Sequence, residues 1–380
     1  MRGEKENQGE LFFVIDVESR IRADHPLRAL KKQVDSILGD LDEAFAKAYS
    51  LKGRPGVPPE RLLKALLLMA LYSIRSERQL VERIDTDLLF RWFLDMSPED
   101  TAFDATVFTH NRNRLEEHEI TASFFDAVVR TAMAKGLCSD DHFSVDGTMI
   151  ESFASIKSFR PKDEEPKDQD SNSFKSRNAE VDFHGEKRSN DTHNSRTDPE
   201  AKLYRKGPGK PALLSHLGHV LSENRHGLIV ELAVTEANGK AESEAAVDMI
   251  DRYTSKHGRP PKTVGADKGY DNGELLQELE RREIVPHIAM TKNDPADPTT
   301  ARADRKPGIE ARLRMRDRMQ TIEYQVSQRT RKKVEECFGW LKTIAGLDRS
   351  RWVGRWKLRQ YMEIGAAAFN LLRIRKLTAA

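Results

Sequence analysis

The feature of this sequence that most restricts its fold is a change of hydrophobic pattern near residue 141. Beyond that point, apolar residues alternate with polar ones or form short runs, which is typical of strands. Helical periodicity appears at about 242–254 and 272–282, between the later strands. The expected strands lie at 142–151, 213–221, 228–235, 263–266 and 284–289. Three strands in succession, then helices alternating with strands, predict one mixed sheet with helices packed on it.

The first part of the chain carries helical signals alone. Pro58 and Pro59 precede an apolar run, as prolines often do at helix starts. Ser76 followed by Gln79 is typical of a capping box. Residues 1–140 are therefore expected to form an all-helical N-terminal domain. The element order beyond it is that of the RNase H-like fold, so we predict an α/β protein with an RNase H-like mixed sheet flanked by helices.

Two of the expected N-terminal helices, joined by residues 73–75, can be interpreted in two ways. As a helix-turn-helix, they would place the second helix in the major groove of DNA. As ordinary bundle helices, they would only pack on their neighbours. The sequence leaves both interpretations open, and the helical domain is expected to bind DNA or to mediate dimerisation.

The remaining boundaries follow from composition. Residues 141–345 are predicted to be the catalytic domain, and 346–380 a basic C-terminal segment whose helix, at about 356–377, packs on the core. Residues 157–200 are almost free of aliphatic side chains, which predicts a flexible insertion. Residues 291–322 are interpreted as a charged, irregular connector.

Charge is unevenly distributed along the chain. Residues 301–380 contain 20 Lys and Arg against 8 Asp and Glu, whereas the whole chain has a formal net charge of only +2. Such a segment is expected to meet a polyanion, and nucleic acid is favoured over a merely solvated helix face. The two cysteines exclude a disulfide framework and a Cys-rich zinc site. Because neither a signal peptide nor a membrane-spanning run is found, a cytoplasmic location is expected.

Two acidic residues occupy unusual places in the expected sheet. Asp146 lies inside the strand 142–151, where a carboxylate is costly to bury without a partner. Gly147 beside it lets another group approach closely. Asp267 ends the strand 263–266, and ligands usually bind at the carboxyl ends of strands in open sheets. Either acid alone is more often structural than functional, so the case depends on a third residue.

That third residue is Glu335, on a helix expected over about 324–343. At about 100° per residue, Gln328, Arg331 and Lys342 share its face of the helix. Apolar residues flank this polar stripe, so it borders the core instead of facing open water.

The spacing Arg331-x3-Glu335-x6-Lys342 resembles the Tyr-x2-Arg-x3-Glu-x6-Lys signature of bacterial insertion-sequence DDE transposases, with Gln328 in the place of the tyrosine. The resemblance extends over most of the chain outside 157–200. Each short motif is weak alone, but their order is specific. The other similar segments are residues 53–94, 104–115, 145–148, 218–228, 266–271, 286–289, 338–342 and 366–372.

The resemblance implies that Asp146, Asp267 and Glu335 are the catalytic acids and the metal ligands. Glu336 is the alternative third acid, but it points about 100° away from Glu335. Three carboxylates with no obligatory His or Cys suit two Mg²⁺ ions, or Mn²⁺ in their place, better than zinc. Asp146 is expected to bridge both ions, with one of the other acids on each.

Six side chains are expected to contact DNA. Lys268, Arg331 and Lys342 would offset the repulsion between the acids and bind phosphates. Residues 349–359 alternate cations with tryptophans, which suits phosphate contacts and stacking. Tryptophans that pack the last helix on the core would give the same pattern. From this segment, Arg351, Trp352 and Arg355 are predicted to bind DNA.

The implied activity is cut-and-paste transposition of an insertion sequence. Water attacks one strand at the end of the element, and the freed 3′-hydroxyl then attacks target DNA. The expected partners are the element ends, the target DNA and a second copy of the chain, because two ends must be held at once, at the bacterial nucleoid. Two alternatives remain: an RNase H-like nuclease that does not join strands, and a catalytically inactive DNA-binding protein derived from a transposase. The three intact acids argue against the inactive protein.

Overall fold

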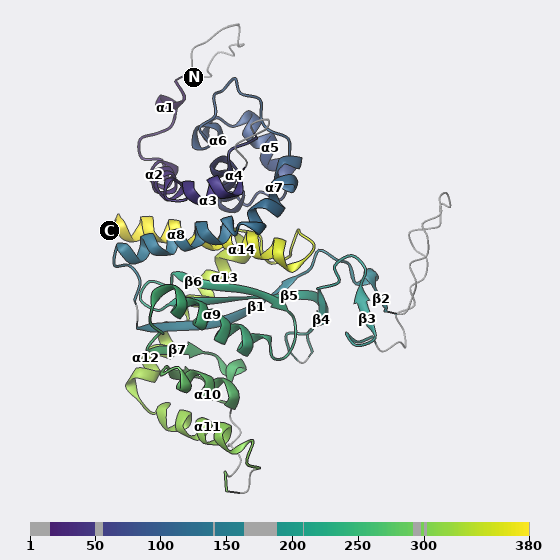
Figure 1. The fold of residues 1–380 in the computed structure, drawn as a ribbon, viewed down its shortest axis with the longest axis vertical. Helices are drawn as coiled ribbons and strands as arrows, with labels where there is room; N and C mark the ends of the chain where they lie inside the picture. The colour runs from purple at the N-terminus through teal and green to yellow at the C-terminus, as the bar shows by residue number, and fades with distance from the viewer. Residues whose placement is uncertain are drawn as a thin grey trace, which may run out of the picture.

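The computed structural model describes residues 16–49, 56–139, 141–162, 188–207, 209–291, 298–299 and 302–379 (Figure 1). A group of short helices at the N-terminal end adjoins two long helices that lie side by side, and a mixed sheet follows beneath them. Further helices pack on the sheet and extend from its far edge. Among the described residues, no helix combines the length and apolar character that crossing a bilayer requires.

Before residue 140 the described elements are all helices: α1 (Val17–Arg20), α2 (Pro26–Gly39), α3 (Asp42–Ala48), α4 (Pro59–Leu71), α5 (Glu77–Thr86), α6 (Leu88–Phe93), α7 (Thr106–Glu117) and α8 (Ile120–Ala134). The predicted all-helical region is thus confirmed for the described residues. Ser76 caps α5 as expected, because its side chain accepts a hydrogen bond of 3.2 Å from the backbone N–H of Gln79.

Six strands form the mixed sheet: β1 (His142–Glu151), β4 (Lys202–Tyr204), β5 (Leu213–Glu223), β6 (Ile229–Glu236), β7 (Thr263–Ala266) and β8 (Val285–Ile288). β5 pairs antiparallel with β1 along one edge and with β6 and β4 along the other. β7 pairs parallel with β1, and β8 parallel with β7. The sheet is the predicted RNase H-like mixed sheet, in which the antiparallel strands β4, β6, β5 and β1 continue into the parallel strands β7 and β8.

The helices of the second half are α9 (Ala241–His257), α10 (Gly273–Arg281), α11 (Lys306–Arg318), α12 (Ile322–Thr330), α13 (Lys333–Thr343) and α14 (Arg355–Thr378). Both α9 and α14 pack on β6. Nearly every residue of β5 is buried, as expected for a strand covered on both faces. The central strands therefore carry polar side chains only where other residues partner them or where a site is formed.

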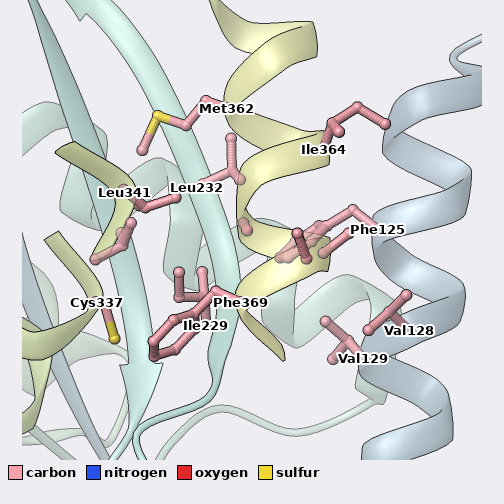
Figure 2. Close-up of a cluster of buried hydrophobic side chains, with 14 of the residues drawn as sticks. Phe125, Val128, Val129, Ile229, Leu232, Cys337, Leu341, Met362, Ile364 and Phe369 are labelled. Atoms are coloured by element: carbon pink, nitrogen blue, oxygen red, sulfur yellow. The ribbon is translucent and has the colours of Figure 1, made fainter. Parts of the chain in front are cut away.

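α14 is the buried centre of the molecule. It runs beside α8 between the N-terminal helices and the sheet (Figure 1). Figure 2 shows its side chains meeting Phe125 and Val129 of α8 on one side and Ile229 of β6 on the other. Residues 366–368 are three fully buried alanines, which let the neighbouring elements approach closely. One continuous cluster of buried apolar residues joins the N-terminal helices, α14 and the sheet, so the two halves of the chain share a core.

The predicted flexible insertion over 157–200 was wrong at both ends. β2 (Phe159–Pro161) and β3 (His193–Ser195) form a two-stranded hairpin in which Phe159 is buried (Figure 1). Asp198 is fully buried against the main sheet, where it accepts a hydrogen bond from the Ser152 hydroxyl and lies 2.9 Å from His216 Nε2. The composition of residues 157–200 could not predict this order, because Asp198 is held by polar contacts with Ser152 and with His216 of β5. Residues 163–187 lie outside the described residues.

The predicted irregular connector over 291–322 was also wrong, because it contains α11. This helix packs on α10 through two glycines, Gly273 and Gly308, and a Cβ on Gly273 would lie 2.8 Å from Gly308 Cα. Its buried residues are Ala311 and Met315, one turn apart. The apolar signal of so narrow a stripe is lost among the surrounding charges.

The single helix predicted over about 324–343 is broken into α12 and α13. At the break, the backbone N–H of Val334 donates to the carbonyl of Arg331 at 2.9 Å. The N–H of Glu335 likewise donates to the carbonyl of Lys332 at 3.1 Å. These bonds reach back three residues instead of four, which tightens the turn.

Glu363 makes stability depend on pH. This α14 carboxyl is buried, it accepts a hydrogen bond of 2.6 Å from the Thr121 hydroxyl, and burial raises its pKa to about 7. Since the folded-state pKa exceeds the unfolded one, the stabilisation is complete below about pH 4.5 and is lost as pH rises through about 7. We expect Glu363→Gln to remove this fall and to raise the free energy of unfolding at pH 8 by about 1–3 kcal/mol, measured by urea denaturation.

Glu117→Gln, an exposed change on α7, is the control and should leave the pH dependence as it is in the native chain. If Glu363→Gln loses stability between pH 5 and pH 8 as steeply as the native chain, then this carboxyl is not responsible.

Candidate active site

The pairing of β1 with β7 brings the first two predicted acids together. In this parallel register Ser144 lies opposite Gly265. Continued by two residues, the register places Asp146 level with Asp267, and neighbouring strands of a sheet are about 4.8 Å apart. β7 ends at Ala266, so beside Asp146 the edge of β1 is open to other groups.

Asp146 is a half-buried carboxylate with little positive charge around it. Its Oδ1 accepts a hydrogen bond of 2.8 Å from the N–H of Gly147. Burial raises the pKa of Asp146 to about 6, against the effect of that hydrogen bond. The charge of Asp267 raises it further, Arg331 lowers it, and Glu335 adds a smaller rise. The three predicted acids therefore act on one another electrostatically, as members of one site do.

Arg331 lies between two of these acids, at the break between α12 and α13. Its Nη1 is 3.7 Å from Asp146 Oδ2, and its Nη2 is 3.8 Å from Glu335 Oε1. The side chain of Glu335 is 63% exposed and leans on this guanidinium. Glu336 forms an ion pair of 2.8 Å with Arg373 of α14, on another side of the helix. Of the two adjacent acids, the structure thus brings Glu335 and not Glu336 to Asp146.

Gln328 holds this helix pair on the sheet. Its Nε2 donates to the carbonyl of Ala266 at 3.1 Å and also to the carbonyl of His287. Ala266 directly precedes Asp267, so the residue in the place of the signature tyrosine fixes α12 against the strand that carries the second acid. Sequence reasoning identified the departure from the signature but not this contact, which depends on three separate segments.

Asp267 begins a tight turn in which Lys268 is exposed. Its Oδ1 accepts a hydrogen bond of 2.8 Å from the N–H of Gly269. Four residues further on, Asp271 accepts two hydrogen bonds from the Arg312 side chain, of 2.9 and 2.8 Å. Arg312 belongs to α11, so the helix missed by sequence analysis anchors the loop after the second acid.

A fourth carboxylate, Glu242, stands beside the predicted acids and was missed by sequence analysis. It lies in the first turn of α9. A Cβ on Gly147 would be 3.1 Å from Glu242 Oε1, and one on Gly269 would be 3.4 Å from Glu242 Oε2 and 3.0 Å from Asp267 Oδ1. Because both atoms surround the same Cβ position, the distance between Glu242 Oε2 and Asp267 Oδ1 cannot exceed the sum of 3.4 and 3.0 Å. An acid in the first turn of a helix is so common that no sequence signal marked this one.

The donor set fits a divalent ion. Carboxylate oxygens from β1, the end of β7 and α13 are the ligands that Mg²⁺ and Mn²⁺ prefer. As the side chains stand, no three His, Cys, Asp or Glu residues of the described chain are close enough together to hold an ion. Repulsion keeps carboxylates apart when nothing neutralises them. The exposed Glu335 side chain is able to turn toward Asp146.

The other residues predicted to bind DNA have internal partners. Lys342 donates a hydrogen bond of 3.0 Å to the carbonyl of Met149 on β1. Arg351 donates one of 2.7 Å to the carbonyl of Ile74, Trp352 packs 4.3 Å from the ring of Tyr361, and Arg355 donates one of 2.8 Å to Glu200. These contacts attach the loop before α14 to its surroundings, and contact of the four residues with DNA stays a prediction.

The histidines of β5 and β8 contact neighbouring residues of the fold. His216 pairs with Asp198, and His219 shares a hydrogen bond of 2.8 Å with the Thr235 hydroxyl. His287 is buried edge-on against Tyr324, and burial lowers its pKa to about 4.

A mixed sheet of this order, with one acid inside β1 and another just after the end of β7, defines the class of RNase H-like enzymes that act on nucleic acid. Residues 15–114 match the family described as Transposase domain (DUF772), and residues 191–371 match the Transposase DDE domain. Together the two matches cover about three quarters of the chain. The protein belongs to the DDE transposases: it is an enzyme that binds DNA and depends on divalent metal ions. No curated protein matches the chain.

Several solved transposase structures are similar to the chain at low sequence identity. A piggyBac transposase synaptic complex with hairpin DNA matches with a TM-score of 0.39 and 11% identity, over 93% of this chain and 75% of that one. A Mos1 transposase paired-end complex matches with a TM-score of 0.21 and 10% identity, over 78% of this chain and 81% of that one. A Mos1 mariner paired-end complex with Mn matches with a TM-score of 0.20 and 11% identity, over 85% and 88%.

Gly147 offers a test of the crowding in the site. A Cβ there would lie 3.1 Å from both Glu242 Oε1 and His219 Nδ1, closer than such contacts normally are. We expect Gly147→Ala to reduce transposition about tenfold or more by displacing these side chains, while lowering the free energy of unfolding by only about 1–3 kcal/mol. Gly39→Ala at the end of α2, where a Cβ meets nothing within 4 Å, is the control. Full activity of Gly147→Ala would show that the site tolerates the displacement.

Proposed function

We propose that Asp146, Asp267 and Glu335 hold two Mg²⁺ ions and catalyse the cleavage and strand transfer that move an insertion sequence. Two observations support this proposal: the register of β1 and β7 sets Asp146 level with Asp267, and Arg331 lies 3.7 Å from Asp146 and 3.8 Å from Glu335. Mn²⁺ has the same ligand preference and is expected to replace Mg²⁺.

The reaction consists of two phosphoryl transfers at one site. In the first, a water oxygen forms a bond to phosphorus at the element's end, and the bond from phosphorus to the 3′ oxygen breaks, leaving a 3′-hydroxyl. In the second, that hydroxyl oxygen attacks a phosphorus of the target strand and displaces its 3′ oxygen. When bound, paired divalent ions activate the attacking oxygen and stabilise the leaving one.

The protein contributes position and charge to both steps. Burial keeps Asp146 fixed on a central strand, and Gln328 ties the helix before Glu335 to the strand before Asp267. Arg331 offsets the negative charge, and in the proposed complex it shares the DNA phosphate with the exposed Lys268.

The proposed working unit is a homodimer on DNA, acting at the bacterial nucleoid. Cut-and-paste transposition requires both ends of the element at the same time, and each end needs a site. The helical N-terminal region is the candidate for binding the ends, because the basic residues Arg78 and Arg83 of α5 are exposed.

Neutralising each acid tests the assignment. We expect Asp146→Asn, Asp267→Asn and Glu335→Gln each to lower transposition of a marked element by about a thousandfold or more, since each removes a ligand of the reacting site. Glu336→Gln, which changes the neighbouring acid on the same helix, should retain most of the activity. Transposition that survives any of the three site changes would remove that residue from the mechanism.

Strand transfer separates a transposase from a simple nuclease. With Mg²⁺ or Mn²⁺, the purified protein should join the 3′ end of the DNA that flanks its gene to a target plasmid, and EDTA should stop both cleavage and joining. Cleavage without joined product would assign only the nuclease step to this chain.

A further inference from the structure

The carboxylate of Glu242 lies beside two glycines. A Cβ on Gly147 would be 3.1 Å from Glu242 Oε1, which is tighter than a normal contact, and a Cβ on Gly269 would be 3.4 Å from Glu242 Oε2. Within the described chain, no residue forms a salt bridge with Glu242. Other half-buried acids of this fold, such as Asp271 with Arg312, have such a partner. The carboxylate of Glu242 thus lies near Asp267 and Asp146, and no salt bridge within the described chain neutralises it.

Two buried polar groups also point to a missing occupant of this pocket. Tyr270 is 1% exposed, and its buried hydroxyl oxygen has no hydrogen-bond partner among the described residues. Its electrostatic neighbours are Glu242, Asp146 and Asp267. The Nδ1 of the fully buried His219 also has no partner there, and a Cβ on Gly147 would be 3.1 Å from it and 3.1 Å from Glu242 Oε1. Buried groups of this kind normally have partners, so a ligand or its bound water is expected beside them.

We infer that Glu242 is a fourth carboxylate ligand of the divalent-metal site, contributed by the first turn of α9. The inference rests on the proposed function, because it takes Asp146 and Asp267 as ligands of the same ions. The transposase signature lies on α12 and α13, so it does not include Glu242, which is on α9.

The charge balance supports this role. Glu242 is near the charges of two further carboxylates, Asp267 and Asp146, and a nearby cation, the exposed Lys206, offsets only part of this negative charge. The positive charge of Arg331 lies beside Asp146 and Glu335, and Arg331 forms no salt bridge with Glu242 among the described residues. A divalent cation would neutralise the remaining acids and give the Tyr270 hydroxyl and His219 Nδ1 a water ligand to bind.

Binding of Mn²⁺ to the full-length protein without DNA tests the inference, with the number of bound ions and their affinity read by electron paramagnetic resonance. Glu242→Gln should weaken binding of at least one ion about tenfold or more. Asp146→Asn should do the same if the proposed site is correct. Glu244→Gln is the matched control, because Glu244 is an exposed acid in the same helical turn.

The thermal unfolding temperature of the same variants, measured with and without Mn²⁺, gives a second test. Without metal, Glu242→Gln should unfold at a higher temperature than the native chain, since it removes repulsion, and it should gain less from added Mn²⁺. Binding by Glu242→Gln that equals that of Glu244→Gln, while Asp146→Asn loses an ion, would overturn the role of Glu242 and leave the proposed function intact. Unchanged binding by Asp146→Asn would instead overturn the proposed metal site itself.

Discussion

The short parallel pairing of β1 with β7 is the constraint on which the site depends. It joins residues more than a hundred positions apart and sets Asp146 level with Asp267. Because β7 ends one residue before Asp267, no β7 residue pairs with β1 beside Asp146, and that edge of β1 is left to the turn that Asp267 begins. A change of register by one residue would turn Asp146 to the other face of the sheet and separate the pair.

The chemistry proposed for the site depends on repulsion between carboxylates that the fold brings near one another. Carboxylates brought together at low exposure repel one another, and burial raises the pKa of Asp146 to about 6. The chain offsets part of this with Arg331, placed by the tight turn between α12 and α13. In the proposed function, the remaining negative charge attracts divalent cations, so that a local cost in stability would serve catalysis.

The rest of the molecule supports this edge of the sheet. The side chains of α14 belong to a core that the N-terminal helices and the sheet share (Figure 2). Because this core is closely packed, the two halves of the chain are held in one fixed arrangement. α11 is tied through Arg312 to the loop that follows Asp267, and Gln328 fixes α12 to the strand before it. Elements that carry no catalytic group thus determine where the catalytic groups lie.

The sequence by itself determined most of the element types and the mixed sheet, and it singled out the three acids of the proposed site. Strand and helix periodicities are local, and the spacing from Arg331 to Lys342 lies within one short segment, so both can be read without knowing the fold. Long strands with alternating apolar residues, such as β1, gave a clear signal, whereas α11, with two buried residues among many charges, gave almost none.

Only the tertiary structure decided which charges meet. The place of Glu242 depends on α9, on β1 and on the turn after β7, and two glycines make room for it. The burial of Asp198 depends on a strand outside its own segment. Such contacts are set by strand register and helix packing, which act through space and leave no periodic trace in the chain.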